Sequence, residues 1–532
     1  MSSSVESRLA TPSSIRQNIR RAVQARDVKA ALSLCQAMLK LPAANVRDCM
    51  DMANLGEQFS DAKTSVLAVR AAHERAPDDL PLLFELINVE RLCGYTEDAF
   101  SHLELARSKC KTSGDFNELG KLYSHLEDVD RALSASQTAC DMASSNLAAL
   151  VNLATAHSYK GQMAKAEELY DEAIRRGNHD AFTYLNRSWL RKQSNDRNHI
   201  VELDQVIKSM PSTDPTAPFL LYTLSKELED LGRNDEAFDA LEMAASARRK
   251  QIEFSLSQTA SEFEDIAKTC SADVILSENG DSDSKEPTFI VGLPRSGSTL
   301  VERIIGNHGD VFAAGELDSL SHMIRLKSAE LARASGVLNT DPLRTLMHGD
   351  LSDFANAYIS STRPRTGHTA HFIDKQPTNF MFCAVIAKAF PNAKIVHTYR
   401  NPMDACFAVY KQPFRDGYLY SYDQRELAGY YLAYRKLMDH WESVMPGRII
   451  HVCYDDLVAD AEPLVRDLMI SLELDWQDAC LDFTKNSQAS MTASSAQVRQ
   501  PIYKTSVQKW RQVGDRLTVL RQALEKGGIE IE

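Results

Sequence analysis

A chain of 532 residues is too long for a single hydrophobic core, so two or more domains are expected. Its apolar fraction of 44% and charged fraction of 25% are ordinary for a globular protein. The formal net charge is −13, and about −12 of it lies before Thr288, while the charges of the remainder nearly cancel. The lack of a broad basic surface argues against a general nucleic-acid binder.

The ten cysteines are scattered and include no C-x-x-C pair. This spacing disfavours a zinc site or a disulfide framework and favours isolated thiols in a reducing compartment. The N-terminal sequence MSSSVESRLATPSSIRQ lacks the apolar core of a signal peptide, and no run of 18 apolar residues is available to span a bilayer. We therefore expect a cytoplasmic protein that contacts neither a membrane nor a metal.

Small and apolar residues recur at fixed offsets in the first half of the chain. The reference positions Ala53, Ile87, Gly120 and Ala154 are separated by 34, 33 and 34 residues, and each of the first three is followed at 12, 16 and 19 residues by further residues of this kind. Ile19 extends the series backwards, and the distance of 71 residues from Ala154 to the next match leaves room for a degenerate unit near position 188. Such a period predicts helix pairs that stack on one another.

This spacing resembles the tetratricopeptide repeat, with about seven units expected between residues 12 and 250. The alternative is an irregular helical domain in which the alanine spacing arose by chance. The resemblance implies an all-α solenoid domain over residues 12–270 whose concave surface holds a peptide or a partner protein. Its acidity would favour basic or neutral partners.

The polar, acidic segment 271–287, SADVILSENGDSDSKEP, is interpreted as an interdomain linker. The apolar run Thr288–Leu293 that follows predicts a buried parallel strand, and Leu300–Asn307 predicts a helix. Between them stands the glycine-bounded sequence GLPRSGST. A strand, a glycine loop and a helix start together form a site for an anion, because main-chain N–H groups and the helix dipole converge there.

The spacing of this loop is that of G-x-x-x-x-G-K-[ST], except that Ser298 stands where a nucleoside-triphosphate loop has lysine. The cation is instead Arg295, two residues before the second glycine. The sequence PRSGST resembles the 5′-phosphosulfate loop of sulfotransferases that use 3′-phosphoadenosine 5′-phosphosulfate. The resemblance implies that the donor is bound by the residues of this loop, which are Pro294, Arg295, Ser296, Gly297, Ser298 and Thr299.

Three later segments fit the same family. The sequence DKQP resembles its K-x-P segment, whose lysine, here Lys375, neutralises charge as the S–O bond to the nucleotide breaks. The strand-like AKIVHTYR ends at Arg400, the family's contact to the 3′-phosphate. A serine usually follows eight residues later, but this chain has Ala408, so either Lys411 or a main-chain group compensates or the affinity is reduced. In RIIHVCYDDL, Tyr454 matches a tyrosine that packs near the adenine, although a core tyrosine would give the same pattern.

The C-terminal sequence SSAQVRQPIYK…KW resembles the family's closing loop around the donor. Arg499 and Lys504 are the expected donor contacts, with solvated surface charges as the alternative, and Trp510 is expected to anchor the turn. Glu316 matches the Gly-Glu position where the tyrosylprotein-like branch has its general base. His308 is the rival base, although a packing role is more usual at the end of a helix.

The chain is thus expected to be an all-α tetratricopeptide solenoid joined to an α/β P-loop-like sulfotransferase domain with a parallel sheet over residues 288–532. The catalytic residues would be Glu316, Arg295 and Lys375. Peptide tyrosine, a sugar hydroxyl and a small phenol all stay open as acceptors. Two other classes also stay open: a P-loop kinase, which the missing lysine opposes, and a non-catalytic repeat adaptor with a degenerate nucleotide domain, which Ala408 favours.

Overall fold

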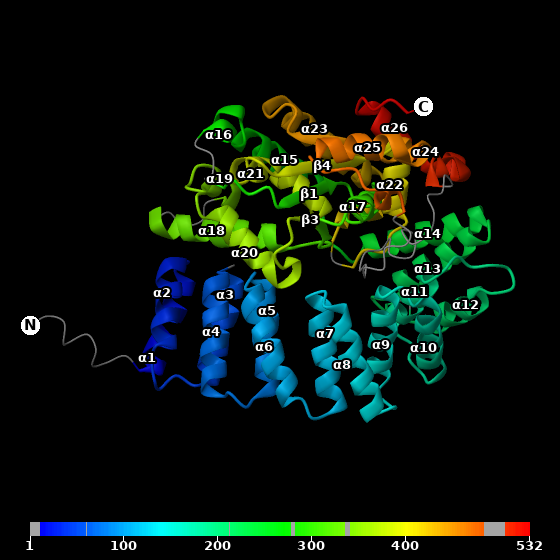
Figure 1. The fold of residues 1–532 in the computed structure, drawn as a ribbon. Coiled ribbons are helices and arrows are strands. Elements are labelled where there is room, and N and C mark those ends of the chain that lie inside the picture. The colour runs from blue at the N-terminus through cyan, green and yellow to red at the C-terminus, as the bar shows by residue number, and fades with distance from the viewer. Residues whose placement is uncertain are drawn as a thin grey trace, which may run out of the picture. The chain divides into compact units, whose positions relative to one another are not determined.

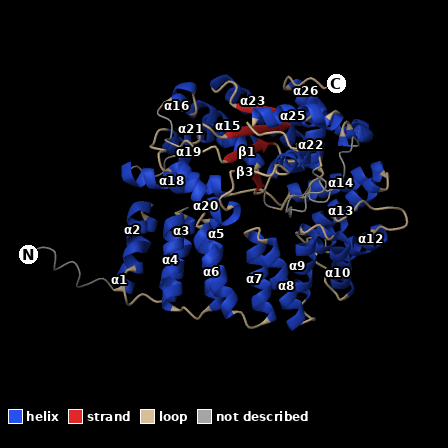
Figure 2. Cartoon of the chain, viewed as in Figure 1, coloured by secondary structure: helices blue, strands red, loops and turns tan. Residues whose placement is uncertain are grey.

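The computed structural model describes residues 11–59, 61–211, 213–277, 282–335, 341–415, 417–482 and 506–531. The chain divides into two compact units, whose helices and strands are labelled in Figure 1 and coloured by type in Figure 2. The first unit contains the residues up to Met142 together with Asp318–Gly367, and the second contains Ala143–Leu317 and the chain from His368 onward.

Helical repeats fill the N-terminal part of both units. In the first unit the described helices form four successive pairs: α1 (Pro12–Gln24) with α2 (Val28–Leu39), α3 (Val46–Gln58) with α4 (Ala62–Arg75), α5 (Leu80–Leu92) with α6 (Thr96–Lys109), and α7 (Ser113–His125) with α8 (Val129–Met142). In the second unit three more pairs follow: α9 (Leu147–Tyr159) and α10 (Met163–Arg175), α11 (Ala181–Trp189) and α12 (Ile200–Ser209), and α13 (Ala217–Asp230) and α14 (Asn234–Arg249). The seven expected units are therefore present.

The small residues of the period lie where the helices of a pair approach each other. Gly120 on α7 faces Ser136 on α8, and a Cβ added at Gly120 would lie 2.8 Å from Ser136 Oγ. Ala53, Ile87 and Ala154 are likewise buried. Most of the helices begin after a side-chain cap, for example Asn45, whose Oδ1 accepts a hydrogen bond from the N–H of Asp48. The period of about 34 residues thus reflects close helix packing.

The sixth pair is the irregular one. Helices α11 and α12 are only 9 and 10 residues long, whereas the other repeat helices have 12 to 16. Ser188 is buried, but the chain leaves helical geometry shortly after it and returns at Ile200. Instead of packing mainly on α12, helix α11 packs on α13. This agrees with the degenerate unit expected near position 188.

The C-terminal part of the second unit is built on a five-stranded parallel sheet of order β2-β3-β1-β4-β5. Its strands are β1 (Pro287–Gly292), β2 (Val311–Ala313), β3 (His371–Lys375), β4 (Lys394–Tyr399) and β5 (Ile449–Cys453). Every residue of β1 is buried, as expected for a central parallel strand that is covered on both faces. The expected α/β domain with a parallel sheet is confirmed.

Helices cover both faces of this sheet. On one side, side chains of the strands pack with helices α17 (Ser298–Ile305), α24 (Tyr454–Ala459) and α25 (Ala461–Ser471) in a single apolar cluster. Further helices described in this unit are α15 (Leu256–Thr269), α21 (Cys383–Ala389), α22 (Pro402–Tyr410), α23 (Gln424–Val444) and α26 (Thr518–Lys526), with short 3-10 helices η2 (Pro377–Phe382), η3 (Leu419–Tyr422), η4 (Asp478–Leu481) and η8 (Lys509–Leu517).

The connection between β2 and β3 belongs to a different unit from the sheet. Its helices α18 (Ser319–Ser335), α19 (Pro342–Met347) and α20 (Phe354–Thr366) belong to the first unit. Helix α20 packs on α6, and Arg365 pairs with Glu127 at 2.7 Å between Nη1 and Oε2. A segment from inside the predicted sulfotransferase domain therefore belongs to the same unit as the first four repeats. This exchange was not expected from the sequence.

The segment expected to be a linker contains a short helix, α16 (Ala272–Leu276). Ile275 is buried, and Lys388 on α21 donates hydrogen bonds to the carbonyl of Val274 and to Ser277 Oγ, both at 3.2 Å. Ile275 inside an otherwise polar stretch favours the helix, because it supplies an apolar side chain to bury, whereas Leu276 is 73% exposed. Residues 278–281 lie outside the described ranges.

Within the described ranges, each helix is too short or too polar to cross a lipid bilayer. Among the same residues, no three His, Cys, Asp or Glu side chains are grouped in a way that could hold a metal ion.

Candidate functional site

The glycine loop connects β1 to α17, as the sequence predicts. Arg295 and Gly297 have positive φ angles of 65° and 99°. A Cβ at Gly297 would lie 2.4 Å from Cδ2 of Tyr454, so the loop tolerates no side chain there. Ser296 is buried, and its Oγ lies 2.8 Å from Thr398 Oγ1 on β4. The loop is therefore fixed against two neighbouring segments, and the first N–H groups of α17 lie at its end, where an anion is stabilised.

Lys375 ends β3 beside this loop and is completely buried. Its ammonium group forms a hydrogen-bonded ion pair with Glu316, whose side chain is 40% exposed. The N–H of Lys375 donates to the carbonyl of Gly315 at 2.9 Å. Two residues 59 positions apart are thus brought together because the Gly-Glu segment continues along the end of β3. Two of the three expected catalytic residues are in direct contact.

A second carboxylate, Glu302 on α17, completes this group, and the sequence analysis missed it. Glu302 is buried; its Oε1 accepts a hydrogen bond from the N–H of Gly315 at 3.0 Å, and its Oε2 lies 4.0 Å from Lys375 Nζ. Glu302 therefore holds the turn that carries Glu316, and both carboxylates interact with Lys375. The available signal was the charged pair Glu302-Arg303 inside the apolar residues of LVERII, because burying a carboxylate requires a partner.

Arg400 follows β4 and is 8% exposed. Its Nη1 lies 3.5 Å from the carbonyl oxygen of Arg295 and its Nη2 donates to the carbonyl of Ser506 at 2.8 Å. The same Nη2 is 3.5 Å from Asp404 Oδ2. Arg400 Nε is buried and has no hydrogen-bond partner among the described residues. A buried guanidinium with an unused donor, next to the glycine loop, fits an anionic group such as a phosphate.

Tyr454 lies between these elements. Its ring is 4.9 Å from the guanidinium carbon of Arg400, and its hydroxyl is 2.8 Å from Ser506 Oγ. Because the ring also covers Gly297, it contacts the loop, the arginine and the C-terminal segment together. This arrangement goes beyond that of an ordinary core tyrosine.

The C-terminal segment is described from Ser506 onward, so Arg499 and Lys504 lie outside the described residues. Trp510 is buried, as expected for an anchor. The N–H groups of Gln508 and Trp510 donate to the two carboxylate oxygens of Asp404, at 2.5 and 3.1 Å. Asp404, on the helix that follows Arg400, was not singled out from the sequence. It holds the segment next to the arginine.

Two other expectations concern residues outside this arrangement. His308 is buried, with Nε2 3.0 Å from the carbonyl oxygen of Asp475 and Nδ1 accepting from the N–H of Asp310 at 3.2 Å. Both ring nitrogens of His308 therefore contact main-chain groups, which favours a structural role for His308 over that of a base. Lys411 was the other cation considered near Ala408. Its ammonium group is paired with Glu229 of helix α13 at 2.7 Å.

Both parts of the chain match known protein families. Residues 287–478 match the sulfotransferase family and residues 147–176 match the tetratricopeptide repeat. An uncharacterized protein of Aquifex aeolicus is 30% identical over 317 residues, which are 58% of this chain and 42% of that protein. The protein-tyrosine sulfotransferase of Drosophila melanogaster is 23% identical over 245 residues, 42% of this chain and 46% of that protein. The chain thus matches less than half the length of either relative.

Among solved structures, the sulfotransferase domain of the Synechococcus olefin synthase is similar over 48% of this chain and 98% of that domain, with 19% identity and a TM-score of 0.35. The resemblance drawn from the loop and repeat residues is confirmed: the C-terminal part of the chain has the sulfotransferase fold, and the N-terminal part consists of tetratricopeptide repeats.

Proposed function

We propose that this protein transfers the sulfuryl group of 3′-phosphoadenosine 5′-phosphosulfate to an acceptor hydroxyl. The observation that carries the proposal is the contact between Lys375 and Glu316 beside the glycine loop. A buried ammonium next to a carboxylate that is 40% exposed gives one group suited to a departing phosphate and one that an acceptor can reach.

In this reaction Glu316 would take the proton of the acceptor hydroxyl while the acceptor oxygen forms a bond to sulfur. The bond between sulfur and the bridging oxygen breaks, and that oxygen leaves on the 5′-phosphate of 3′-phosphoadenosine 5′-phosphate. Lys375 and Arg295 would neutralise the charge that develops on the leaving phosphate. Lys375 is paired with Glu316 before the donor binds. Donor binding therefore has to draw the ammonium group of Lys375 partly away from Glu316. The carboxylate of Glu316 is then freer to accept a proton.

The donor would be held by the loop residues 294–299 at its 5′ end and by Arg400 at its 3′-phosphate. The unused Nε of Arg400 supports this assignment. So does the distance of 3.5 Å between its Nη1 and the main-chain carbonyl of Arg295, because Arg400 then lies beside the loop. Tyr454 would lie beside the adenine, and Arg499 and Lys504 would complete the site. The main-chain carbonyl of Ser506 already orients Arg400, which lies two residues before the helix that has Ala408 in place of the expected serine.

For the acceptor we propose peptide tyrosine. The support is the Gly-Glu position of Glu316 and the similarity to relatives named protein-tyrosine sulfotransferase in Drosophila melanogaster and Danio rerio, both at 23% identity. The repeats would then present the peptide, as helical solenoids offer extended binding surfaces.

The deciding experiment is calorimetry of the full chain with 3′-phosphoadenosine 5′-phosphate and, separately, with ADP in the presence of Mg²⁺. The proposal requires a strong preference for the 3′-phosphorylated nucleotide. Preference for ADP with Mg²⁺ would favour a kinase and overturn the proposal. Sulfur-labelled donor, offered with tyrosine peptides, sugars and small phenols, then identifies the acceptor; tight donor binding without transfer to any of them would favour the adaptor.

A further inference from the structure

Helix α13 of the last repeat carries a carboxylate that contacts the sulfotransferase fold. Glu229 Oε1 lies 2.7 Å from Lys411 Nζ and 2.9 Å from Lys509 Nζ. Its side chain is only 20% exposed. Burial alone would raise the pKa of Glu229, but the two ammonium groups outweigh it and lower the pKa to about 2. One carboxylate therefore pairs with two lysines in a partly buried place.

The two lysines belong to the elements that surround Arg400. Lys411 directly follows α22, the helix that begins two residues after Arg400, and its ammonium group lies 4.5 Å from the centre of the Phe407 ring. Lys509 lies between Gln508 and Trp510, whose N–H groups are bound by Asp404. The C-terminal segment is thus held from two sides, by Asp404 of α22 and by Glu229 of the repeat helix.

A second repeat helix contributes to the same contact. Arg516 Nη2 in η8 pairs with Asp239 Oδ1 at 2.5 Å and with Glu242 Oε2 at 3.4 Å, both on α14. The Arg516 guanidinium also lies 4.7 Å from the ring centre of Phe238. The segment that carries the carbonyl bound by Arg400 is therefore attached to both helices of the last repeat.

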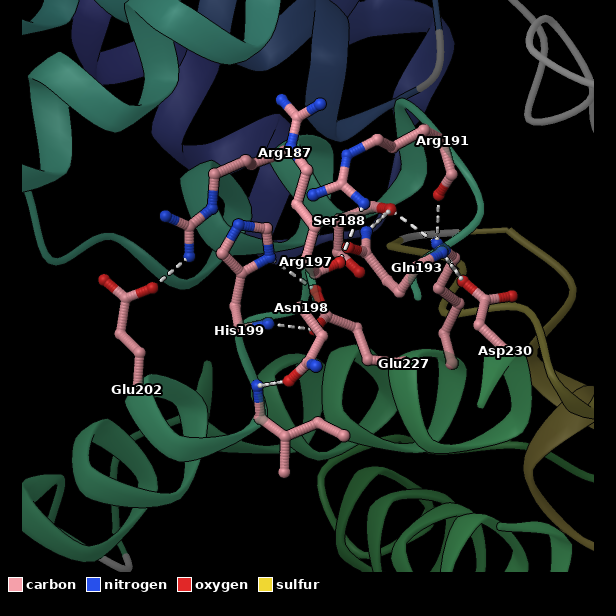
Figure 3. Close-up of polar contacts among 12 residues, drawn as sticks. Arg187, Ser188, Arg191, Gln193, Arg197, Asn198, His199, Glu202, Glu227 and Asp230 are labelled. Atoms are coloured by element: carbon pink, nitrogen blue, oxygen red, sulfur yellow. Dashed lines mark hydrogen bonds and ion pairs between the residues drawn. The ribbon is translucent and has the colours of Figure 1, made fainter. Parts of the chain in front are cut away.

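Helix α13 is itself fixed by the irregular sixth unit (Figure 3). Asp230 accepts a hydrogen bond from the N–H of Gln193 at 2.8 Å, and Glu227, which is completely buried, binds both the N–H and Nδ1 of His199 at 2.6 and 2.8 Å. Lys226 donates to the carbonyls of Ser188 and Arg191 at 2.5 and 2.6 Å. Polar groups made available where the repeat loses its helical form thus bind the end of α13 that carries Glu229.

We propose that Glu229 is a positioning residue for donor binding: through Lys509 it keeps the segment around Ser506 against Arg400, so the last repeat is part of the nucleotide site. This inference rests on the proposed function for its nucleotide. It assigns to the repeats a role distinct from binding a peptide. Removing the Glu229 carboxylate leaves the ammonium groups of Lys411 and Lys509 close together in a partly buried place. Helix α13 also loses its ion pair with the C-terminal segment, so the two separate.

The test compares Glu229→Gln with Glu236→Gln in the full chain. Glu236 lies on α14 and pairs only with the exposed Arg233 among the ion pairs of the described residues, so it matches the change in net charge. In Glu229→Gln the affinity for 3′-phosphoadenosine 5′-phosphate should fall about fivefold or more, with KM of the acceptor unchanged. The control should bind as the wild type does. Equal binding by Glu229→Gln and wild type would overturn the proposal.

A double-mutant cycle with Lys509→Met separates a linkage from a general loss of structure. If Glu229 acts through Lys509, the double variant should bind no more weakly than the weaker single variant. Fully additive losses would contradict the linkage. Glu229→Asp keeps the charge and should retain part of the affinity, while the cooperative thermal transition of each variant shows that the fold is intact.

Hydrogen exchange without nucleotide keeps this proposal distinct from the proposed function. In Glu229→Gln the amides of Gln508 and Trp510 should exchange faster than in wild type, because their segment has lost the attachment through Lys509. If wild type fails to bind the 3′-phosphorylated nucleotide, the proposed function falls, and unchanged exchange in Glu229→Gln would then overturn the linkage as well. Faster exchange with unchanged nucleotide affinity would overturn the positioning role.

Discussion

The guanidinium group of Arg400 lies over the ring of Tyr454, 4.9 Å from its centre. This contact connects the end of β4 to the end of β5, two neighbouring strands whose carboxyl ends meet at one edge of the sheet. Ligands of open parallel sheets bind at this edge. The pair therefore orients a cation where the proposed donor would lie, and the ring also closes against Gly297.

Substitution of Tyr454 should separate its two contributions. Tyr454→Phe keeps the ring over Arg400 but loses the hydroxyl contact to Ser506, so affinity for 3′-phosphoadenosine 5′-phosphate should fall about two- to tenfold, the net value of one hydrogen bond. Tyr454→Ala also loses the cation–π contact and should cost about tenfold more. Calorimetry measures both; equal affinities for the two variants would show that the ring contributes nothing.

Gly297→Ala should disrupt the loop. The new Cβ would lie 2.4 Å from Tyr454 Cδ2, and the residue would also keep its φ of 99°. We expect a loss of about 2 kcal/mol or more in unfolding free energy, or an equivalent loss of nucleotide affinity if the loop rearranges. Gly447→Ala is the matched control, because Gly447 also has a positive φ, of 72°, but a Cβ there meets no atom within 4 Å. A loss no larger than that of the control would contradict the steric argument.

Glu316→Gln should separate donor binding from turnover. Without the carboxylate the acceptor hydroxyl keeps its proton, so kcat should fall about 10²- to 10⁴-fold. Donor affinity should be maintained or improved, because Lys375 loses its competing partner. Single-turnover transfer and calorimetry measure the two effects. Glu462→Gln, which removes an exposed carboxylate paired with Arg466, serves as the charge control. Full turnover by Glu316→Gln would remove the assignment of the base.

Gly120→Ala tests the repeat packing. Its Cβ would lie 2.8 Å from Ser136 Oγ on the neighbouring helix, so we expect a loss of about 1–3 kcal/mol of stability despite the better helix propensity of alanine. Gly114, at the start of the same helix, would place a Cβ 3.7 Å from the nearest atom, Thr112 Oγ1. Gly114→Ala should therefore be neutral or stabilising. Urea unfolding measures both, and a stable Gly120→Ala would show that the helices can move apart freely.

Stability should depend on pH through His397. Burial, together with the nearby His451 and Arg435, lowers the pKa of His397 to about 3. Between pH 3 and the usual histidine value of about 6.5, the unfolded chain binds a proton that the folded chain does not. This group's contribution is therefore complete above pH 6.5 and decreases as the pH falls towards 3, by up to about 1.4 kcal/mol per pH unit.

Comparison of His397→Gln with wild type isolates this effect. Its deficit in unfolding free energy should be largest at pH 7.5 and should become smaller towards pH 5, because only the wild type loses the contribution of a neutral buried imidazole. Urea midpoints at several pH values measure the difference. His348→Gln, at an exposed position, is the control. A deficit that stays constant with pH would contradict the expectation.

The sequence alone determined the features that depend on local spacing. The period of about 34 residues follows from helices that must approach at small residues such as Gly120, and this packing repeats at each unit. The loop from Gly292 to Thr299 is equally local, because a strand, three residues with positive φ and a helix start follow one another in one stretch of chain. Ser298 in place of lysine could be read in the same way.

Only the tertiary structure decided which distant residues meet. Asp404 and Glu229 look like ordinary surface acids in the sequence, since a carboxylate gives no local sign of the partner it will have. The partners of Asp404 come from the C-terminal segment, and those of Glu229 come from that segment and from the end of α22. The exchange of helices α18–α20 into the first unit was hidden for the same reason: the sequence records which helix faces are apolar, but the surface that covers each face is chosen by the packing of the whole chain.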